Sequence, residues 1–152
     1  MGPHLTFEEL NTLSTDDIAR LCACPIADND HLYQYAIIRK DLEMPAGKLS
    51  AQTGHAYGDA FADAQRINPE RARGYRDPGT GGSKVSLKAK NATQLIRAYR
   101  EALESGLPCA LIVDQHHVMP PHFTGEPVIT AVGIGPCTQA EARHITKRFN
   151  CL

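Results

Sequence analysis

Short apolar runs alternate with helix-like segments along this chain, and that alternation limits its fold more than any other feature. Runs typical of buried strands occupy four ranges: 33–42, 84–90, 108–114 and 127–136. Segments typical of helices occupy three ranges: about 48–67, 92–106 and 139–149. Strands and helices in the order β-α-β-α-β-β-α predict an α/β layered domain around a largely parallel or mixed sheet.

Capping residues support these boundaries. Asn91 stands where the second helix should begin, and Gly106 stands where it should end. Thr138 precedes the third helix in the same way. Nearer the N-terminus, Ser14 resembles an N-cap, so we expect one or two short helices there.

The first thirty residues differ in composition from the rest of the chain. They hold six acids and one base, and a proline and an Asp-Asn-Asp turn close them. We therefore expect a short, acidic, helical N-terminal extension over 1–30. The remaining residues, 31–152, are enough for one domain with a single core.

Composition disfavours several classes of protein. No apolar run approaches the roughly 20 residues of a membrane span, and no secretion signal is visible at the N-terminus. The five cysteines are odd in number and unevenly spaced, which favours reduced thiols over disulfides. We expect a cytoplasmic protein without membrane contact.

The net charge of −1 argues against a protein that binds nucleic acid through charge alone. This average conceals a basic region, because residues 66–100 hold nine bases against two acids. Such a region could face phosphates, or it could consist of ordinary solvated helix and loop surfaces.

Three polar residues interrupt the first predicted helix: Lys48, Gln52 and His55. Their i, i+4, i+7 spacing places them along one stripe, which must find partners or face a cleft if the helix packs closely. Its small residues would permit such packing: Ala51, Gly54, Ala56, Gly58, Ala60 and Ala64. If the first and third strands are parallel neighbours, Lys48 and Asp114 converge beyond their carboxyl ends. Each residue taken alone also fits a purely structural role.

A second group of polar side chains lies in the loop that follows the third strand. It contains Asp114, His116, His117 and His122, whose carboxylate and imidazole groups suit zinc. Their spacing fits no established zinc signature, and a loop can carry histidines without a metal. We therefore predict no metal site, while a metal-dependent hydrolase stays open as one alternative.

Several stretches together resemble the peptidyl-tRNA hydrolase family of the archaeal and eukaryotic type. The stretch "YAIIRKDLEMPAGKLSAQTGHA" is similar, without gaps, to that family's strand, R-D-L-x-M loop and G-K-x-x-A-Q-x-x-H-A helix. The similarity continues through "KVSLKAKNATQLIRAYREALESGLPCALIVD" and "ITAVGIGP", and it covers residues 31–152. The resemblance implies a three-layer α/β/α fold with a four-stranded mixed sheet, frequent homodimers and no cofactor.

The resemblance also implies an activity, which is cleavage of the ester between a peptide and the terminal ribose of tRNA. It places five residues at the family's functional positions: Lys48, Gln52, His55, Asp114 and Thr130. As a hypothesis, Asp114 activates the water, Lys48 stabilises negative charge and Thr130 hydrogen-bonds the scissile group. Gln52 and His55 would fix Lys48 or the substrate. Basic side chains of residues 66–100 would bind the tRNA phosphates, and the candidates for these contacts are Arg76, Lys84 and Lys88.

The chain departs from the family's pattern after Asp114. The family has A-G-R-T-Q there, whereas this chain has "QHHVM" and a loop that is a few residues longer. Val128 replaces the first threonine of the family's G-T-x-T, and Thr130 retains the second. These departures leave open a non-catalytic RNA- or protein-binding module on the same fold.

Overall fold

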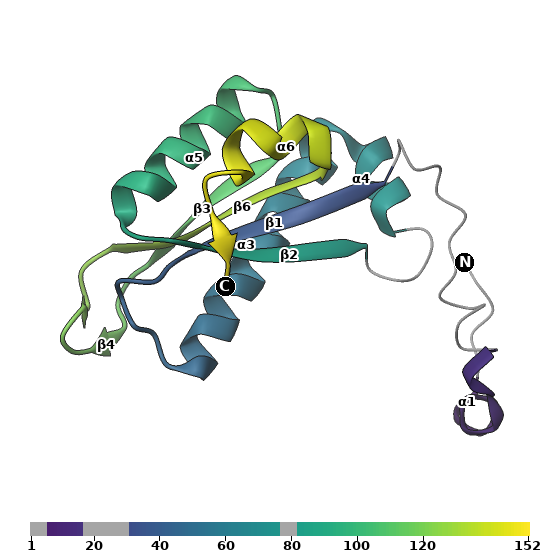
Figure 1. The fold of residues 1–152 in the computed structure, drawn as a ribbon. Coiled ribbons are helices and arrows are strands. Elements are labelled where there is room, and N and C mark those ends of the chain that lie inside the picture. The colour runs from purple at the N-terminus through teal and green to yellow at the C-terminus, as the bar shows by residue number, and fades with distance from the viewer. Residues whose placement is uncertain (1–5, 17–30, 77–81) are drawn as a thin grey trace.

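A five-stranded sheet in the order β3-β6-β1-β2-β7 forms the centre of the molecule (Figure 1). The structure, a computed structural model, describes residues 6–16, 31–76 and 82–152. The strands of the sheet are β1 (Leu32–Arg39), β2 (Ser83–Ala89), β3 (Cys109–Asp114), β6 (Val128–Thr138) and β7 (Asn150–Cys151). The helices are α1 (Phe7–Thr12), α3 (Ala46–Ile67), α4 (Pro69–Arg76), α5 (Ala92–Glu104) and α6 (Gln139–Thr146). Of the described helices, none is long and apolar enough to cross a membrane.

The directions of the strands determine which segments meet at each edge of the sheet. β1 pairs in parallel with β2, and β6 runs antiparallel to both β1 and β3. β1, β2 and β3 therefore point the same way, so their carboxyl ends share one edge. Because α3 follows β1, its N-terminus begins at the edge where β3 ends.

The predicted count of four strands is wrong, because β7 adds a fifth strand beside β2. β7 is only two residues long, too short for the alternating pattern that marks a strand in a sequence. Two further additions to the predicted order are α4 and a hairpin of β4 (Val118–Met119) and β5 (Phe123–Thr124). Pro69 at the first position of α4 suits a helix start. The short helix predicted after Ser14 falls mostly outside the described residues.

The predicted caps of α5 and α6 are confirmed. Asn91 Oδ1 accepts a hydrogen bond from the backbone N–H of Gln94 at 3.0 Å. Gly106 follows α5 with a positive φ of 69°, which is favourable for glycine. Thr138 and Glu141 form a reciprocal capping box at the start of α6. Local sequence signals therefore determine where these two helices begin.

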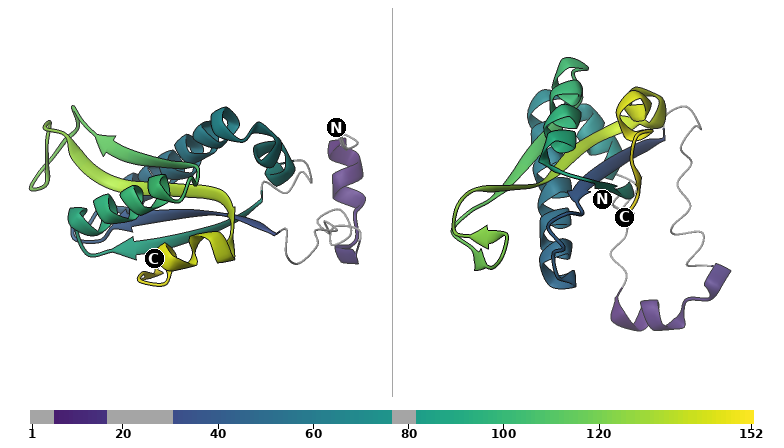
Figure 2. Two further views of the ribbon diagram at one scale, coloured as in Figure 1. Left: turned by 90° about the horizontal axis from the view of Figure 1, so that it is seen from above. Right: turned by 60° about the vertical axis from the view of Figure 1, so that its left-hand side comes forward.

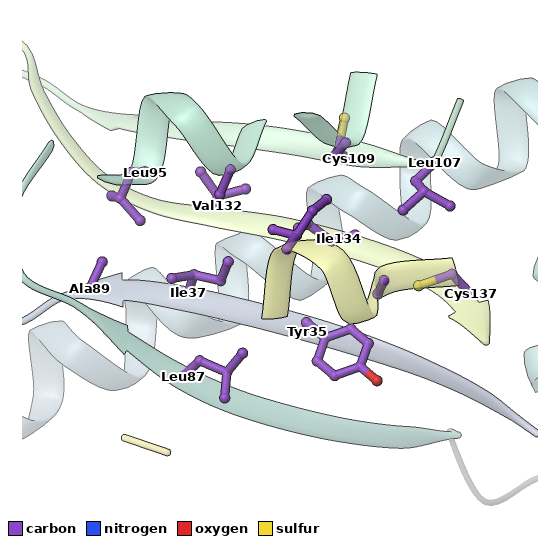
Figure 3. Packing of buried hydrophobic residues seen from close by; sticks show 14 residues of the cluster. Tyr35, Ile37, Leu87, Ala89, Leu95, Leu107, Cys109, Val132, Ile134 and Cys137 are labelled. Carbon is purple, nitrogen blue, oxygen red and sulfur yellow. The ribbon is translucent and has the colours of Figure 1, made fainter. Parts of the chain in front are cut away.

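α3 covers one face of the sheet, whereas α5 and α6 cover the other, as the two further views show (Figure 2). Tyr35 and Ile37 of β1 belong to the larger hydrophobic core, which they share with residues of α5 and α6 (Figure 3). Ala36 and Ile38 point to the other face and pack with Ala56 of α3. This alternation follows from the two-residue period of a strand and leaves β1 buried on both faces.

α3 lies close to the sheet because the strand beneath it carries a glycine. A Cβ atom at Gly133 of β6 would overlap the carbonyl oxygen of Ala56. On the helix side the contact is made by three fully buried alanines: Ala56, Ala60 and Ala64. The expectation for the other small residues is wrong, since Ala51, Gly54 and Gly58 are exposed. Helical geometry explains this, because only positions four apart stay on the buried ridge.

Candidate functional site

Two side chains of opposite charge meet at the carboxyl edge of the sheet. Lys48 Nζ lies 2.8 Å from Asp114 Oδ2. Lys48 is on the first turn of α3 and Asp114 is the last residue of β3, so the parallel strands bring them together. Their side chains are 11% and 18% exposed, which shields the pair on most sides but leaves it accessible. The predicted convergence of these two residues is confirmed, but the expectation that β1 and β3 are neighbours is wrong, because β6 lies between them.

The β4–β5 hairpin places aromatic side chains beside this ion pair. The ring centroid of Phe123 lies 4.0 Å from Lys48 Nζ, in a position where a cation is attracted to the ring face. The ring of His117 meets that of Phe123 nearly at a right angle, with centroids 6.0 Å apart. Backbone hydrogen bonds of 3.0 Å from His116 N to Gly125 O and from Gly125 N to His117 O close the hairpin.

A β-bulge beside the pair turns Thr130 toward α3. The β3–β6 register shifts between Ile112 and Val113, which leaves Thr130 without an opposite residue on β3. The Thr130 hydroxyl donates to Gln52 Oε1 at 2.6 Å, and both residues are buried. Bulges often re-aim a side chain next to a functional site. Gln52 lies one turn after Lys48, so this bond fixes the first turns of α3 on β6.

Arg39 ties the bulge to the end of β1. Its guanidinium donates to the carbonyl oxygen of Ile129 at 3.0 Å. It also donates to both carboxylate oxygens of Asp41, at 3.0 and 2.7 Å. Hydrogen bonding from Arg39 lowers the pKa of Asp41, and nearby His122 of the hairpin acts in the same direction. Arg39 thereby connects β1, the loop after it and the strand that carries Thr130.

The polar stripe predicted on α3 is only partly formed. Lys48 meets Asp114 and Gln52 is buried, whereas His55 is exposed and its side chain makes no hydrogen bond to a described residue. Residues four apart advance by about 40° around a helix, while a step of three turns about 60° the other way. His55 therefore leaves the ridge that Gln52 and Ala56 continue along the sheet.

Two of the three residues proposed to contact tRNA phosphates, Arg76 and Lys84, lie together where α3, α4 and β2 meet. Lys84 Nζ lies 3.2 Å from the Tyr75 hydroxyl and 5.2 Å from the centroid of its ring. Partial burial lowers the pKa of Lys84, and the charge of Arg76 adds to this effect. Lys88 is exposed and, by strand alternation, lies on the same face of β2 as Lys84. Lys88 thus extends this cationic surface toward the carboxyl edge of the sheet.

The described part of the chain holds no group of three or more His, Cys, Asp and Glu side chains that could bind a metal ion. The loop residues considered as possible ligands have separate neighbours. Asp114 is engaged by Lys48, His117 packs against Phe123, and His122 lies near Asp41. Their arrangement gives no support to a metal site built on this loop.

Sequence reasoning missed Phe123 and Arg39, although each leaves a signal. Phe123 is a large apolar residue in a loop otherwise rich in proline and histidine, and such a residue needs a burial site. Arg39 is a charged residue at the end of a buried strand, where it needs acceptors for its five donors. Neither signal identifies the partner, which depends on the folded chain.

Known proteins resemble the part of the chain that holds this site. Residues 32–152 match the family described as "Peptidyl-tRNA hydrolase PTH2". The peptidyl-tRNA hydrolase of Methanocaldococcus jannaschii is 38% identical over 116 residues, which are 76% of this chain and 96% of that protein. The peptidyl-tRNA hydrolase of Methanococcus vannielii is 37% identical over 123 residues, or 80% of this chain and 100% of that protein.

A more distant relative agrees with these two. The peptidyl-tRNA hydrolase of Sulfolobus acidocaldarius is 32% identical over 113 residues, which are 72% of this chain and 91% of that protein. All three matches extend over nearly the whole length of the relative, and the family match covers the whole sheet. The chain therefore belongs to the peptidyl-tRNA hydrolase PTH2 family.

Proposed function

We propose that this chain hydrolyses the ester between the peptide, or another acyl group, and the terminal ribose of tRNA, and so releases free tRNA. The observation that carries the proposal is the ion pair of Lys48 and Asp114 at the open edge of the sheet. Family membership supports it, since the relatives are named peptidyl-tRNA hydrolases.

The two charged groups have complementary roles in ester hydrolysis. Asp114 orients a water molecule and accepts a proton from it as the oxygen attacks the ester carbonyl carbon. Negative charge then develops on the carbonyl oxygen, where the Lys48 ammonium stabilises it. When the tetrahedral intermediate collapses, the bond to the ribose oxygen breaks, and the leaving hydroxyl takes the proton that Asp114 accepted.

Two neighbouring residues support this pair, and a third faces the solvent. Because the Thr130 hydroxyl is buried and donates to Gln52, we propose that Thr130 acts through Gln52 as a positioning residue. Together they hold the first turns of α3, and hence Lys48, against the sheet. His55 is exposed two turns along the same helix and is available to contact the substrate.

We propose that the tRNA backbone lies along the surface that contains Arg76, Lys84 and Lys88. Lys84 and Arg76 lie on the side of the sheet that α3 covers, as Lys48 does. Tyr57, which is partly exposed beside Lys84, adds an aromatic face on which a base could stack. Lys84→Ala with Lys88→Ala should raise KM and weaken its dependence on salt while kcat is kept. A lower kcat with unchanged KM would contradict this assignment.

The reaction is proposed to need neither metal nor cofactor, so turnover should be unchanged after treatment with a chelator. We assign it to a cytoplasmic enzyme whose hydrolase domain is 31–152, with 1–30 as an extension that should be removable without loss of turnover. A homodimer is expected as well, and sedimentation equilibrium of the full chain tests this expectation.

The central test is turnover of peptidyl-tRNA by variants of the ion pair. Lys48→Met and Asp114→Asn should each lower kcat by about 100-fold or more, since loss of one oxyanion donor alone costs about that much. Lys147→Met, at the end of α6, and Asp59→Asn, exposed on α3, are matched controls that should keep full activity. Unchanged turnover by Lys48→Met would refute the role. A wild-type chain that binds tRNA without hydrolysis would favour the binding module instead.

A further inference from the structure

The β4–β5 hairpin lies in the segment where this chain departs from its family's sequence pattern, yet it contacts the centre of the site. Phe123 is 2% exposed, whereas Val118 on the facing strand of the hairpin is 68% exposed. The hairpin therefore directs one large side chain inward and leaves the other in solvent. The inward side chain covers Lys48.

We propose that Phe123 is a positioning residue for the hydrolysis, and that its ring face holds the Lys48 ammonium in place beside Asp114. This inference rests on the proposed function. A lysine side chain has four rotatable bonds and samples many rotamers unless contacts restrict it. Here two contacts restrict it: Asp114 Oδ2 at 2.8 Å and the Phe123 ring centroid at 4.0 Å.

The chemistry of a ring face explains why phenylalanine suits this position. The face attracts a cation but is a far weaker hydrogen-bond acceptor than a carboxylate or carbonyl oxygen. A second carboxylate would occupy another of the three N–H donors of Lys48 and would offset its charge. With Phe123 there, one donor is directed to Asp114 and the others stay available to the oxyanion. The ring therefore orients the ammonium without competing with the substrate.

The hairpin is built to keep Phe123 in this position. Phe123 pairs with Met119 across the hairpin, next to the turn, and Val118 pairs with Thr124 one residue farther from the turn. The His117 ring packs against the Phe123 ring nearly at a right angle from within the same hairpin. Because these contacts are internal to the hairpin, the ring is supported independently of Lys48.

The first test compares Phe123→Leu with Val118→Ser, a control on the exposed side of the same hairpin. Phe123→Leu should lower kcat for peptidyl-tRNA about tenfold, a loss in the range of a shielded cation–π contact. KM should change less than about twofold, because the tRNA contacts lie elsewhere. Val118→Ser should match wild type. Circular dichroism checks that each variant is folded.

The second test separates the ring's electronic effect from its volume. Trifluorophenylalanine, introduced at position 123 through a reassigned stop codon, keeps the shape of the ring but withdraws electrons from its face. It should lower kcat nearly as much as leucine does. Full activity of the fluorinated enzyme would overturn the proposal, since packing alone would then suffice.

A third measurement does not depend on activity and so separates this inference from the proposed function. The NMR signal of the Lys48 ε-methylene, assigned by its absence in Lys48→Arg, should be shifted upfield by the ring current of Phe123. Phe123→Leu should return it to the position of the solvated lysines. A signal that stays in place in this variant would overturn the proposal even if wild type hydrolyses peptidyl-tRNA.

Discussion

Replacing Thr130 with valine removes one hydroxyl from the interior and changes the side chain's shape very little. That hydroxyl donates to Gln52 Oε1 at 2.6 Å, with Thr130 0% and Gln52 5% exposed. Thr130→Val would therefore bury the Gln52 oxygen without this donor. A buried polar atom left without its partner costs about 1–3 kcal/mol, so the free energy of unfolding should fall by about that amount.

The reciprocal change should cost less, because the Thr130 hydroxyl has a second acceptor. The carbonyl oxygen of Ile112 lies 3.5 Å from it, within reach after a small rotation. Gln52→Leu should therefore destabilise the fold by less than Thr130→Val. The double variant removes both polar groups together, and its stability should lie closer to wild type than the sum of the single changes predicts.

Urea unfolding followed by far-UV circular dichroism measures all four proteins, since the chain has no tryptophan for fluorescence. The coupling free energy from the double-mutant cycle should be at least about 1 kcal/mol. Strictly additive effects would refute the reasoning, because they would mean that the two buried groups do not satisfy one another. The urea midpoints must be compared at unchanged m-values for the cycle to be valid.

Gly133→Ala should lower the free energy of unfolding by about 3 kcal/mol or more, because the added methyl meets helix backbone that cannot rotate away. An unchanged free energy in urea unfolding would contradict this. Asp41→Asn should lower Tm at pH 7 but much less below pH ~4. Hydrogen bonding from Arg39 lowers the pKa of Asp41, so this pair stabilises the fold above the ordinary aspartate pKa. The stabilisation is lost as the pH falls and Asp41 takes up a proton. If the Tm difference between wild type and Asp41→Asn does not change with pH, the Arg39–Asp41 pair does not stabilise the fold in this way. Burial raises the pKa of Cys137 to about 12, so iodoacetamide at pH 8 should modify exposed Cys151 and leave Cys137 intact until urea is added, as peptide mass spectrometry would show.

The ion pair of Lys48 and Asp114 was predictable from the order of strands and helices along the chain, whereas the β-bulge beside it was not. Lys48 follows the first strand and Asp114 ends the third, and these two strands run in the same direction, so both residues reach one edge of the sheet. Thr130, in contrast, faces α3 because the β3–β6 register slips by one residue at this point. A register is a property of two paired strands, and neither sequence contains it alone.

The behaviour of His55 shows the limit of periodicity as evidence. A spacing of i, i+4, i+7 fits one face of a helix, but the face is broad, and only part of it touches the sheet. The strip that α3 buries follows steps of four through Gln52, Ala56 and Ala60. The location of that strip depends on Gly133, which lies 78 residues after His55 in the sequence. Tertiary contact therefore decides which polar residue of the motif is buried and which is exposed.

The chain's departure from its family and the integrity of the ion pair are compatible because they lie on separate elements. α3 and β3 supply Lys48 and Asp114, and the parallel directions of β1 and β3 bring both residues to the same edge of the sheet. The loop between β3 and β6 is free to change in length and composition provided that it still shields the pair. Phe123 meets this condition, since an aromatic face stabilises the ammonium and leaves its donors unused. The altered loop still shields the lysine, so its presence does not by itself argue for a loss of activity.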